Sequence, residues 1–323
     1  MNNCDAISKE NKTIFISGPT AVGKTYIAHN LAKKLKNAEI LSADSMQIYK
    51  QMDLLSAKPT KKQRAQIPYH MIDFVDISQK YTLSDFYKDA LAVIEKIILS
   101  KKIPIVVGGT GLYTRTLLKG ISKAPDNDPL FRKKMQKIVD SKGEKYLHHI
   151  LDKVDPESAK SIDQKNVRRV IRALEVYEIT GKKFSSLKTH WNKPIKKEHP
   201  QMGKLFLWGI CTPRKTLYDK INDRVDKMVD DGLINEVEKL LKIGIMETDG
   251  ASQALGVKDI AKYLNGNVDK KTAIESLKKN TRHFAKRQLT WFSKEPDFKW
   301  YITYKDKDYL SIIDDMVRQI RKE

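Results

Sequence analysis

The chain has 323 residues, of which 40% are hydrophobic and 31% charged, a balance typical of a globular protein and not of a disordered one. Lysine and arginine number 61 against 40 aspartate and glutamate residues, and the net charge of +21 favours either a polyanionic partner or a lysine-rich solvated surface. Cys4 and Cys211 lack metal-ligand spacing, and neither a signal peptide nor a run of about 18 apolar residues occurs, so we expect a cytoplasmic protein without a membrane anchor.

Short apolar runs rich in β-branched residues alternate with amphipathic stretches along the chain. We expect strands at 13–18, 39–44, 70–75, 103–109, 205–211 and 299–303. We expect helices at 26–35, 83–99, 166–181, 217–241 and 276–294. The alternation predicts the α/β class, with a parallel sheet core flanked by helices on both faces. It stops between 121 and 204, so we interpret 1–120 and 205–323 as the core and 121–204 as an inserted helical domain.

The first predicted strand runs directly into a phosphate-binding loop (P-loop) of the form G-x-x-x-x-G-K-T. Its residues are Gly18, Pro19, Thr20, Ala21, Val22, Gly23, Lys24 and Thr25. The two glycines let backbone N–H groups approach phosphate oxygens, and the following helix adds the dipole of its N-terminus. Lys24 is expected to neutralise the outer phosphate, and the Thr25 hydroxyl can ligate Mg²⁺. The pattern therefore predicts a phosphate or diphosphate site, but it does not say which compound carries the phosphate.

An acid and a threonine are expected beside this loop. P-loop proteins that hydrolyse nucleotides usually end a second strand in an acid that holds Mg²⁺, whereas here the run 103–109 leads into Gly-Thr-Gly. The acid is instead Asp44, at the end of the second predicted strand. Because the carboxyl ends of parallel strands face the ligand crevice, Asp44 and Thr110 should both face the bound phosphate. Asp44 could also form an Asx-turn or cap a helix, and Thr110 could serve only the turn.

A carboxylate next to a bound diphosphate can act as a general base while the cationic loop stabilises the leaving group. That chemistry suits phosphoryl transfer to a hydroxyl group. It suits equally well alkyl transfer with diphosphate as the leaving group. The residues around the loop leave these two reactions open.

Two predicted helices carry basic faces. On 276–294, Lys278, Arg282 and Lys286 share one ridge, and no acid occurs between 278 and 294, so we expect uncompensated charge that faces phosphates. On 166–181, the cluster Arg168, Arg169 and Arg172 could bind phosphates or could pair with Glu175 and Glu178. In the helix predicted at 217–241, Arg224 lies near the edge of the apolar stripe.

Taken together, these segments resemble the tRNA dimethylallyltransferases, also called tRNA isopentenyltransferases. The matching segments, in the family's order, are GPTAVGKT (18–25), SADSMQIYKQMDLLSAKPT (42–60), PYHMIDFVD (68–76), FYKDAL (86–91), PIVVGGTGLY (104–113), RRVIRALEVYEITGK (168–182), RVDKMVDDGLINEV (224–237), SQALGVKDI (252–260) and AKRQLTWF (285–292). The resemblance covers nearly the whole chain. It implies a P-loop NTPase-like fold in which the loop holds dimethylallyl diphosphate with Mg²⁺, and transfer of the dimethylallyl group to N6 of the adenosine 3′ of the anticodon.

The resemblance also implies roles for individual residues. Asp44 would remove the N6 proton, and Thr110 would line the channel where a flipped-out adenine meets the prenyl tail. Arg224 would contact the diphosphate beside Lys24 and Thr25. Contacts with tRNA are implied for Asp44, Ser45, Met46, Gln47, Thr110, Arg132, Arg168, Arg169, Arg172, Lys286 and Arg287. The inserted domain would hold the anticodon stem-loop, and we expect the protein to act as a monomer.

Three positions depart from the family's usual pattern: Val257 stands where tyrosine is more common, Tyr69 where histidine is common, and Arg168 where many members have glutamine. Two other functions are consistent with the loop. A small-molecule kinase of the shikimate-kinase type would use ATP, but it does not need the extra length or the basic helices. A P-loop RNA-binding protein without catalysis would gain nothing from Asp44, because a carboxylate repels a polyanion unless it performs chemistry or holds a metal.

Overall fold

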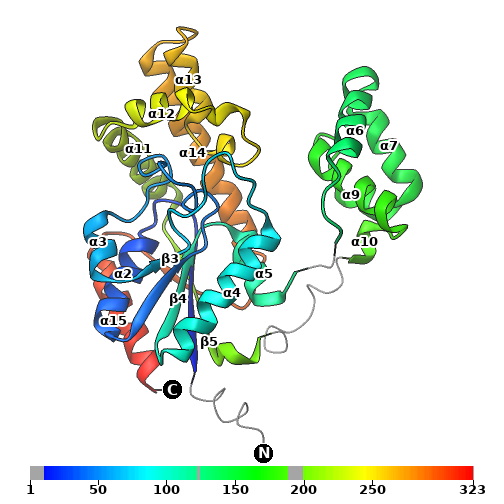
Figure 1. The fold of residues 1–323 in the computed structure, drawn as a ribbon. Helices are drawn as coiled ribbons and strands as arrows, with labels where there is room; N and C mark the ends of the chain where they lie inside the picture. Colours follow the sequence, from blue (N-terminus) through cyan, green and yellow to red (C-terminus); the bar gives the residue numbers. More distant parts are fainter. Residues whose placement is uncertain (1–10, 122–123, 188–198, 323) are drawn as a thin grey trace, which may run out of the picture. The chain divides into compact units, whose positions relative to one another are not determined.

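The computed structural model describes residues 11–121, 124–187 and 199–322. The chain divides into two compact units, one made of Met1–Leu117 and His199–Glu323 and the other of Leu118–Glu198. Figure 1 shows the first unit as a sheet with flanking helices and the second as a group of helices. Among the described residues, no helix is both long and apolar enough to span a membrane.

The first unit is built on a six-stranded sheet in the order β3-β2-β4-β1-β5-β6. Its strands are β1 (Lys12–Ser17), β2 (Ala38–Ser42), β3 (Tyr69–His70), β4 (Ile103–Gly108), β5 (Lys204–Cys211) and β6 (Lys299–Ile302). Every neighbouring pair is parallel. The central strand β1 places Ile14 opposite Ile105 on β4 and opposite Phe206 on β5. The predicted parallel sheet is confirmed, and all six predicted strands occur.

The third strand is shorter than predicted, because β3 ends at His70 and not near residue 75. Met71 and Asp73 have φ angles of 60° and 64°, in the left-handed region. A strand cannot continue through that conformation, since it turns the backbone out of the ladder. Beyond this turn the described chain returns to the neighbouring segment by a single bridge between Tyr49 and Val75.

Helices cover both faces of the sheet. The helices of this unit are α2 (Lys24–Leu35), α3 (Lys61–Gln66), α4 (Leu83–Leu99), α5 (Gly111–Lys119), α11 (Arg214–Asp230), α12 (Leu233–Lys242), α13 (Val257–Leu264), α14 (Lys270–Phe292) and α15 (Asp308–Lys322), with 3₁₀ turns at Pro200–Met202, Ile245–Glu247 and Ala251–Gln253. Helices α2 and α15 lie on one side of the sheet and α4 on the other (Figure 1). On the α2 side, the core joins Ile14 and Ile16 of β1 to Leu31 of α2 and Ile313 of α15.

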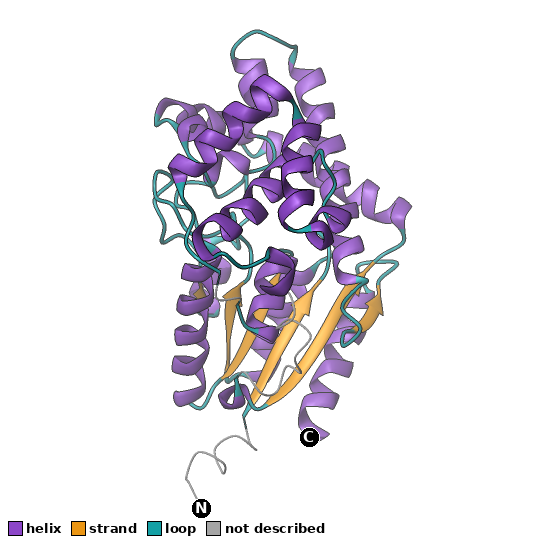
Figure 2. Ribbon diagram, turned by 90° about the vertical axis from the view of Figure 1, so that its right-hand side faces the viewer, coloured by secondary structure: helices purple, strands orange, loops and turns teal. Residues whose placement is uncertain are grey.

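Helices α11 to α14 pack around a second core above the carboxyl ends of the strands (Figure 2). That core combines Val225, Leu233, Val237 and Leu277 with Leu55 from the segment after β2. The single helix predicted at 217–241 is wrong. It is divided into α11 and α12 by Gly232, which has a φ of 103° and ends the regular helical path.

Helix α14 begins earlier than the predicted 276, because Asp269 caps it by accepting a hydrogen bond from the Thr272 N–H. The helix therefore spans 23 residues and passes along both the second core and the sheet. It is consequently in a position to connect the two.

The second unit, as far as it is described, is helical. It contains α6 (Pro129–Lys142), α7 (Glu144–Val154), α8 (Pro156–Ser161), α9 (Val167–Thr180) and α10 (Phe184–Leu187). Its core is formed by residues such as Leu147, Leu151 and Leu174. Helix α9 ends at Gly181 in the left-handed conformation, as predicted from the sequence. The predicted insertion, 121–204, includes residues 122–123 and 188–198, which lie outside the described part of the chain.

Candidate active site

The phosphate loop joins β1 to α2, and its two glycines are required by close contacts. Gly18 has a φ of 146°, and a Cβ at this position would lie 2.2 Å from the carbonyl oxygen of Ile210 on β5. Gly23 has a φ of 87°, and its Cβ would lie 2.5 Å from the ring of Tyr309 on α15. Backbone at such angles is strained for any residue with a side chain, so the loop conformation depends on both glycines.

Two cations point into the loop. The Lys24 amine donates to the Pro19 carbonyl at 2.5 Å, and Arg224 Nη1 donates to the Thr20 hydroxyl at 3.0 Å. Burial lowers the pKa of Lys24 from 10.5 to about 7, while Asp44 raises it and Arg224 lowers it further. Burial also lowers the pKa of Arg224, and Asp44 opposes that effect. An anion bound between the two cations would offset the energetic cost of keeping these buried groups charged, so the electrostatics favour a phosphate or diphosphate here.

A cavity of about 730 Å³ opens beside the loop. Its lining contains most of the residues expected at the site: Thr20, Ala21, Gly23, Lys24, Thr25, Asp44, Ser45, Met46, Gln47, Thr110, Arg224 and Arg287. Apolar side chains from α11 and α14, including Val225, Leu277 and Phe284, line another part. The expected loop residues Gly18, Pro19 and Val22 do not line the cavity. Val22 is instead fully buried in the core.

Asp44 and Thr110 lie where the sequence predicts, at the ends of β2 and β4. The Ala43 N–H donates to the Val107 carbonyl at 2.8 Å, and a Cβ on Gly108 would lie 2.1 Å from the Ala43 carbonyl oxygen. The two strand ends are therefore held together. The Thr110 hydroxyl accepts a hydrogen bond from the Ser45 N–H at 3.1 Å, so this side chain orients the residue next to Asp44.

Asp44 makes the Asx-turn that was considered as an alternative, because its Oδ1 accepts from the Met46 N–H at 2.9 Å. That bond engages one carboxylate oxygen. Among the described residues, no hydrogen bond occupies Oδ2, and the side chain lines the cavity beside Lys24. The turn thus orients the carboxylate and leaves one oxygen available to accept a proton.

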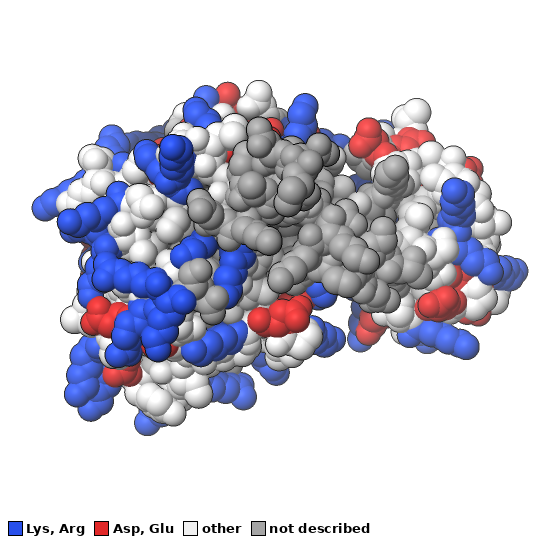
Figure 3. Space-filling model, turned by 90° about the horizontal axis from the view of Figure 1, so that it is seen from below, with Lys and Arg blue, Asp and Glu red and all other residues white. Residues whose placement is uncertain are grey.

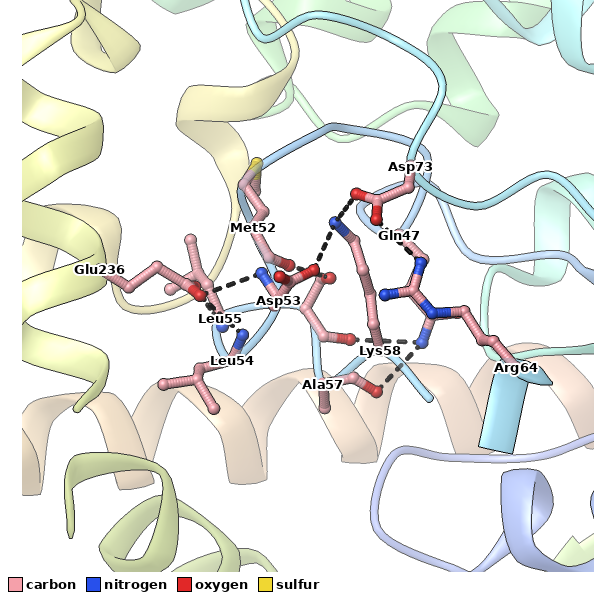
Figure 4. A network of polar contacts seen from close by, with 11 residues as sticks. Gln47, Met52, Asp53, Leu54, Leu55, Ala57, Lys58, Arg64, Asp73 and Glu236 are labelled. Carbon is pink, nitrogen blue, oxygen red and sulfur yellow. Dashed lines mark hydrogen bonds and ion pairs between the residues drawn. The ribbon is translucent and has the colours of Figure 1, made fainter. Parts of the chain in front are cut away.

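Gln47 supports the cavity from behind. Its Oε1 accepts from the Ser42 hydroxyl at 2.8 Å, and its Nε2 donates to the carbonyls of Ser56 and Ala57 at 3.3 Å each (Figure 4). The carboxamide therefore ties the end of β2 to the 55–59 segment that lines the cavity. Ala57 has a φ of 48°, so this segment has a strained bend that such bonds stabilise.

The same segment is held from the other side by Glu236, on α12. The Glu236 carboxylate accepts hydrogen bonds from three consecutive backbone N–H groups, those of Asp53, Leu54 and Leu55, at 3.0, 2.9 and 2.8 Å (Figure 4). An anion that accepts several backbone N–H groups is strongly bound. No local pattern in the sequence marks Glu236, because its partners lie more than 180 residues earlier in the chain.

Lys58 completes this network. Its side chain is only 1% exposed, and its amine pairs with Asp53 at 3.0 Å and with Asp73 at 2.5 Å. Arg64 also pairs with Asp73, at 2.8 Å (Figure 4). These two cations hold the pKa of the Asp73 carboxyl below its usual value, against the effect of burial, which raises it. The cavity wall is consequently fixed by ion pairs and not only by apolar packing.

The basic face predicted on 276–294 is partly neutralised, contrary to expectation. Lys278 pairs with Asp226 of α11 at 2.8 Å and with Glu275 at 3.2 Å, and Arg282 donates to the Asn222 side chain at 2.6 Å. The absence of acids within the segment did not exclude acids on a neighbouring helix. Lys286 and Arg287 remain exposed, and Arg287 lines the cavity.

In the second unit, the arginines expected to bind tRNA separate into two groups. Arg132 and Arg172 both pair with Glu175, which is fully buried, at 2.7 and 2.5 Å. These ion pairs hold the pKa of Glu175 below its usual value although burial raises it. Arg168 and Arg169 are exposed, and so is Arg132 despite its ion pair. Arg172 therefore makes the ion pair with Glu175 that was one of its two predicted alternatives.

Two of the departures from the family's pattern also find a place. Val257 is completely buried in the second core, where it packs and offers no aromatic face. The Tyr69 hydroxyl lies 3.1 Å from His29 Nδ1, and its side chain lines the cavity. Burial raises the pKa of Tyr69, so this phenol stays protonated.

Positive charge is not confined to the cavity. Figure 3, which views the protein from below relative to Figure 1, shows lysine and arginine side chains at many places on the described surface, with fewer acidic ones between them. The net charge of the chain is +21, and part of that positive charge lies on this face as well as at the site. Such a field attracts polyanions over long range, and the attraction weakens as salt is added.

Comparison with known proteins agrees with this geometry. A sequence model of the IPP transferase family matches residues 47–295. The tRNA dimethylallyltransferase of Carboxydothermus hydrogenoformans is 46% identical over 296 residues, which covers 91% of this chain and 93% of the relative. The crystal structure of the full-length tRNA isopentenylpyrophosphate transferase of Bacillus halodurans is 37% identical, covers 97% of both chains and has a TM-score of 0.68. A eukaryotic dimethylallyltransferase solved acting on tRNA is 29% identical, with a TM-score of 0.77 over 96% of this chain and 80% of that one.

Proposed function

This chain belongs to the IPP transferase family, and we propose that it transfers a dimethylallyl group from dimethylallyl diphosphate to N6 of the adenosine 3′ of the anticodon in tRNA, releasing diphosphate. One observation carries this reading beyond family membership. The cavity joins a cationic phosphate loop to Asp44 at the end of β2, while β4 ends in glycine where nucleotide-hydrolysing relatives of the fold usually have an acid. Neither the kinase nor the non-catalytic RNA-binding alternative is favoured by these relatives.

The diphosphate would lie on the loop, between Lys24 and Arg224. Their desolvated charges would stabilise the negative charge that builds up on the leaving group as the bond to the prenyl carbon breaks. The Thr25 hydroxyl has no hydrogen-bond partner among the described residues and lines the cavity. One free hydroxyl next to the phosphates suits Mg²⁺, which prefers phosphate oxygens and retained water to an all-protein cage. Bound there, Mg²⁺ would add Lewis-acid stabilisation of the diphosphate.

Asp44 would accept the proton from N6. Its Oδ1 is held by the Met46 N–H, so Oδ2 is the oxygen that faces the incoming amine. The N6 nitrogen forms a bond to the prenyl carbon, the carbon–oxygen bond to diphosphate breaks, and the N6 proton moves to the carboxylate. A stacked adenine leaves no room for this attack, so the base must be extruded into the cavity, where Thr110 would contact it. General-base catalysis of this kind contributes about 10²–10⁴-fold.

Contacts with tRNA would come from the remaining candidates. We place Ser45, Met46, Gln47 and Arg287 next to the extruded base, because they line the same cavity as Asp44. The inserted unit would bind the anticodon stem-loop through exposed side chains such as Arg168 and Arg169. Arg132 and Arg172 would also shape that unit through their ion pairs with Glu175, and the exposed Arg132 side chain could contact tRNA as well.

The experiment is a transfer assay with the purified protein, dimethylallyl diphosphate, Mg²⁺ and unmodified tRNA. We expect N6-dimethylallyladenosine in the digested tRNA, identified by mass spectrometry. Asp44→Asn should lower the transfer rate about 10²–10⁴-fold while tRNA binding persists. The matched control is Asp297→Asn, at an exposed carboxylate outside the cavity. ATP turnover driven by a small hydroxylated acid, without prenyl transfer, would refute the proposal. An Asp44→Asn rate within a few-fold of wild type would refute only the assignment of the base.

A further inference from the structure

Gln288 lies in α14, is 6% exposed, and places its carboxamide between the two loops that frame the cavity. Its Oε1 accepts a hydrogen bond from the Thr20 N–H at 2.8 Å. Its Nε2 donates to the Gly109 carbonyl at 2.8 Å. One side chain therefore links the phosphate loop to the turn that follows β4, Gly108-Gly109-Thr110-Gly111.

Both ends of this link are next to groups assigned to the reaction. The Thr20 hydroxyl accepts from Arg224, so Thr20 is held by Gln288 through its backbone and by Arg224 through its side chain. Gly109 directly precedes Thr110, whose hydroxyl accepts from the Ser45 N–H beside Asp44. The chain of bonds runs from the diphosphate loop through Gln288 to the turn that orients the base.

The glycines of the turn are shaped around α14. A Cβ on Gly109 would lie 2.4 Å from Gln288 Nε2, and a Cβ on Gly111 would lie 2.1 Å from Trp291 Cδ1. Neither glycine has a positive φ angle. The turn therefore needs glycine at these positions because α14 approaches closely, and not because the backbone adopts a conformation that other residues avoid.

We propose that Gln288 is a positioning residue. It holds the phosphate loop at the distance that the transfer requires from the turn at 108–111, which orients Asp44 through Thr110. This inference rests on the proposed function. The Thr20 N–H is bound to Gln288 and so is not available to a phosphate oxygen. Loss of the carboxamide should consequently spare the binding of the diphosphate and impair the step in which the base and the leaving group act together. A misplacement of about 1 Å can cost about 10²-fold in rate.

The first test compares Gln288→Met and Gln288→Glu with wild type. Methionine has a similar length and makes neither hydrogen bond. Glutamate keeps an acceptor for the Thr20 N–H but places a carboxylate oxygen against the Gly109 carbonyl. We expect kcat to fall about 10–100-fold in both variants, with KM for dimethylallyl diphosphate changed less than about threefold. Gln319→Ala is the matched control, because it removes a carboxamide that bonds Tyr301 and Asp315 away from the cavity. It should leave kcat unchanged.

The second test is a double-mutant cycle with Gly109→Ala. In the wild-type background the new methyl group collides with the Gln288 carboxamide, so this change should lower kcat about as much as Gln288→Met. In a Gln288→Ala background the methyl group has room. Gly109→Ala should therefore cost much less there, and the two changes should be strongly non-additive. A purely structural role would show this coupling in the free energy of unfolding and would leave kcat of the folded variants at the wild-type value.

The outcomes separate this inference from the proposed function. If the wild type transfers the prenyl group while Gln288→Met and Gln288→Glu keep the wild-type kcat, Gln288 is not a positioning residue. Additive effects on kcat in the Gly109 cycle overturn the inference as well. If a Gly109 variant folds too poorly to assay, the kcat values of Gln288→Met and Gln288→Glu decide the matter alone. If the wild type itself gives no transfer, the proposed function fails first.

Discussion

Replacing Lys24 by methionine tests the electrostatics of the phosphate loop directly. A pKa that falls from 10.5 to about 7 means that folding disfavours the charged amine. At about 1.4 kcal/mol per tenfold change in protonation, the penalty is roughly 5 kcal/mol for the fully charged group. Because the side chain also faces the water-accessible cavity, which screens part of the penalty, we expect Lys24→Met to stabilise the ligand-free protein by roughly 2 kcal/mol near pH 7.

The sign of the pH dependence follows from proton binding. The unfolded chain keeps the Lys24 proton up to about pH 10.5, whereas the folded protein releases it near pH 7. Between these values the unfolded state binds more protons, so the stability of the wild type rises with pH. Methionine does not titrate. The advantage of the variant should therefore be largest at and below pH 7 and should shrink towards pH 10.5.

The assay is urea unfolding at pH 6.5, 8 and 9.5, with and without diphosphate. Lys33→Met, at an exposed lysine on the same helix, is the control and should show no such trend. Diphosphate at 100 times its Kd should stabilise the wild type by about 2.7 kcal/mol and the Lys24→Met variant by much less. A variant that is less stable than wild type at pH 7, or whose advantage does not change with pH, would show that burial of Lys24 does not control its charge.

Three further substitutions test the supports of the site. Glu236→Ala leaves three backbone N–H groups of the cavity wall unpaired. It should therefore lower the free energy of unfolding by about 1.5–3 kcal/mol and raise the KM for tRNA. An unchanged KM would exclude a link between this wall and tRNA binding. Glu175→Gln should destabilise the protein by about 3–5 kcal/mol in urea unfolding, whereas Glu178→Gln, at an exposed carboxylate, should not. Gly18→Ala should abolish accumulation of folded protein, because the new Cβ would lie 2.2 Å from the Ile210 carbonyl oxygen on β5. The control is Gly266→Ala, at a φ of 73° with open space around it, which should lower the free energy of unfolding by only about 1 kcal/mol. Equal losses of stability in the two variants would contradict the steric explanation.

Local sequence patterns predicted the features that depend only on residues close together in the chain, namely the phosphate loop and the strands. The phosphate loop was recognisable because Gly18 and Gly23 have a fixed spacing between a strand and a helix. The strands were recognisable because sheets buried on both faces need continuous apolar runs. The predicted boundaries were wrong where a single residue in the left-handed conformation interrupted an apolar pattern. Gly232 ended a helix that the apolar stripe alone would have continued, and the left-handed turn at Met71 shortened β3.

The charged residues show the limit of reading one segment at a time. Lys278 was expected to carry uncompensated charge because no acid follows it for sixteen positions, yet Asp226 on another helix pairs with it. The sequence left two alternatives for Arg172, and the structure shows that it pairs with the buried Glu175. In both cases the acidic partner could be seen in the sequence, but the sequence did not show that it lies next to the basic side chain in space.

By itself, the sequence determined the class of fold, the phosphate loop and the meeting of Asp44 with Thr110, because each follows from short-range spacing and from the rule that parallel strands end at one edge. The tertiary structure alone decided how that edge is held. Gln288 reaches Thr20 across 268 residues, and Glu236 reaches Leu55 across 181. Such bonds form between single side chains and backbone groups of remote loops. They leave no periodic trace in the chain, and only packing brings their atoms within hydrogen-bonding distance.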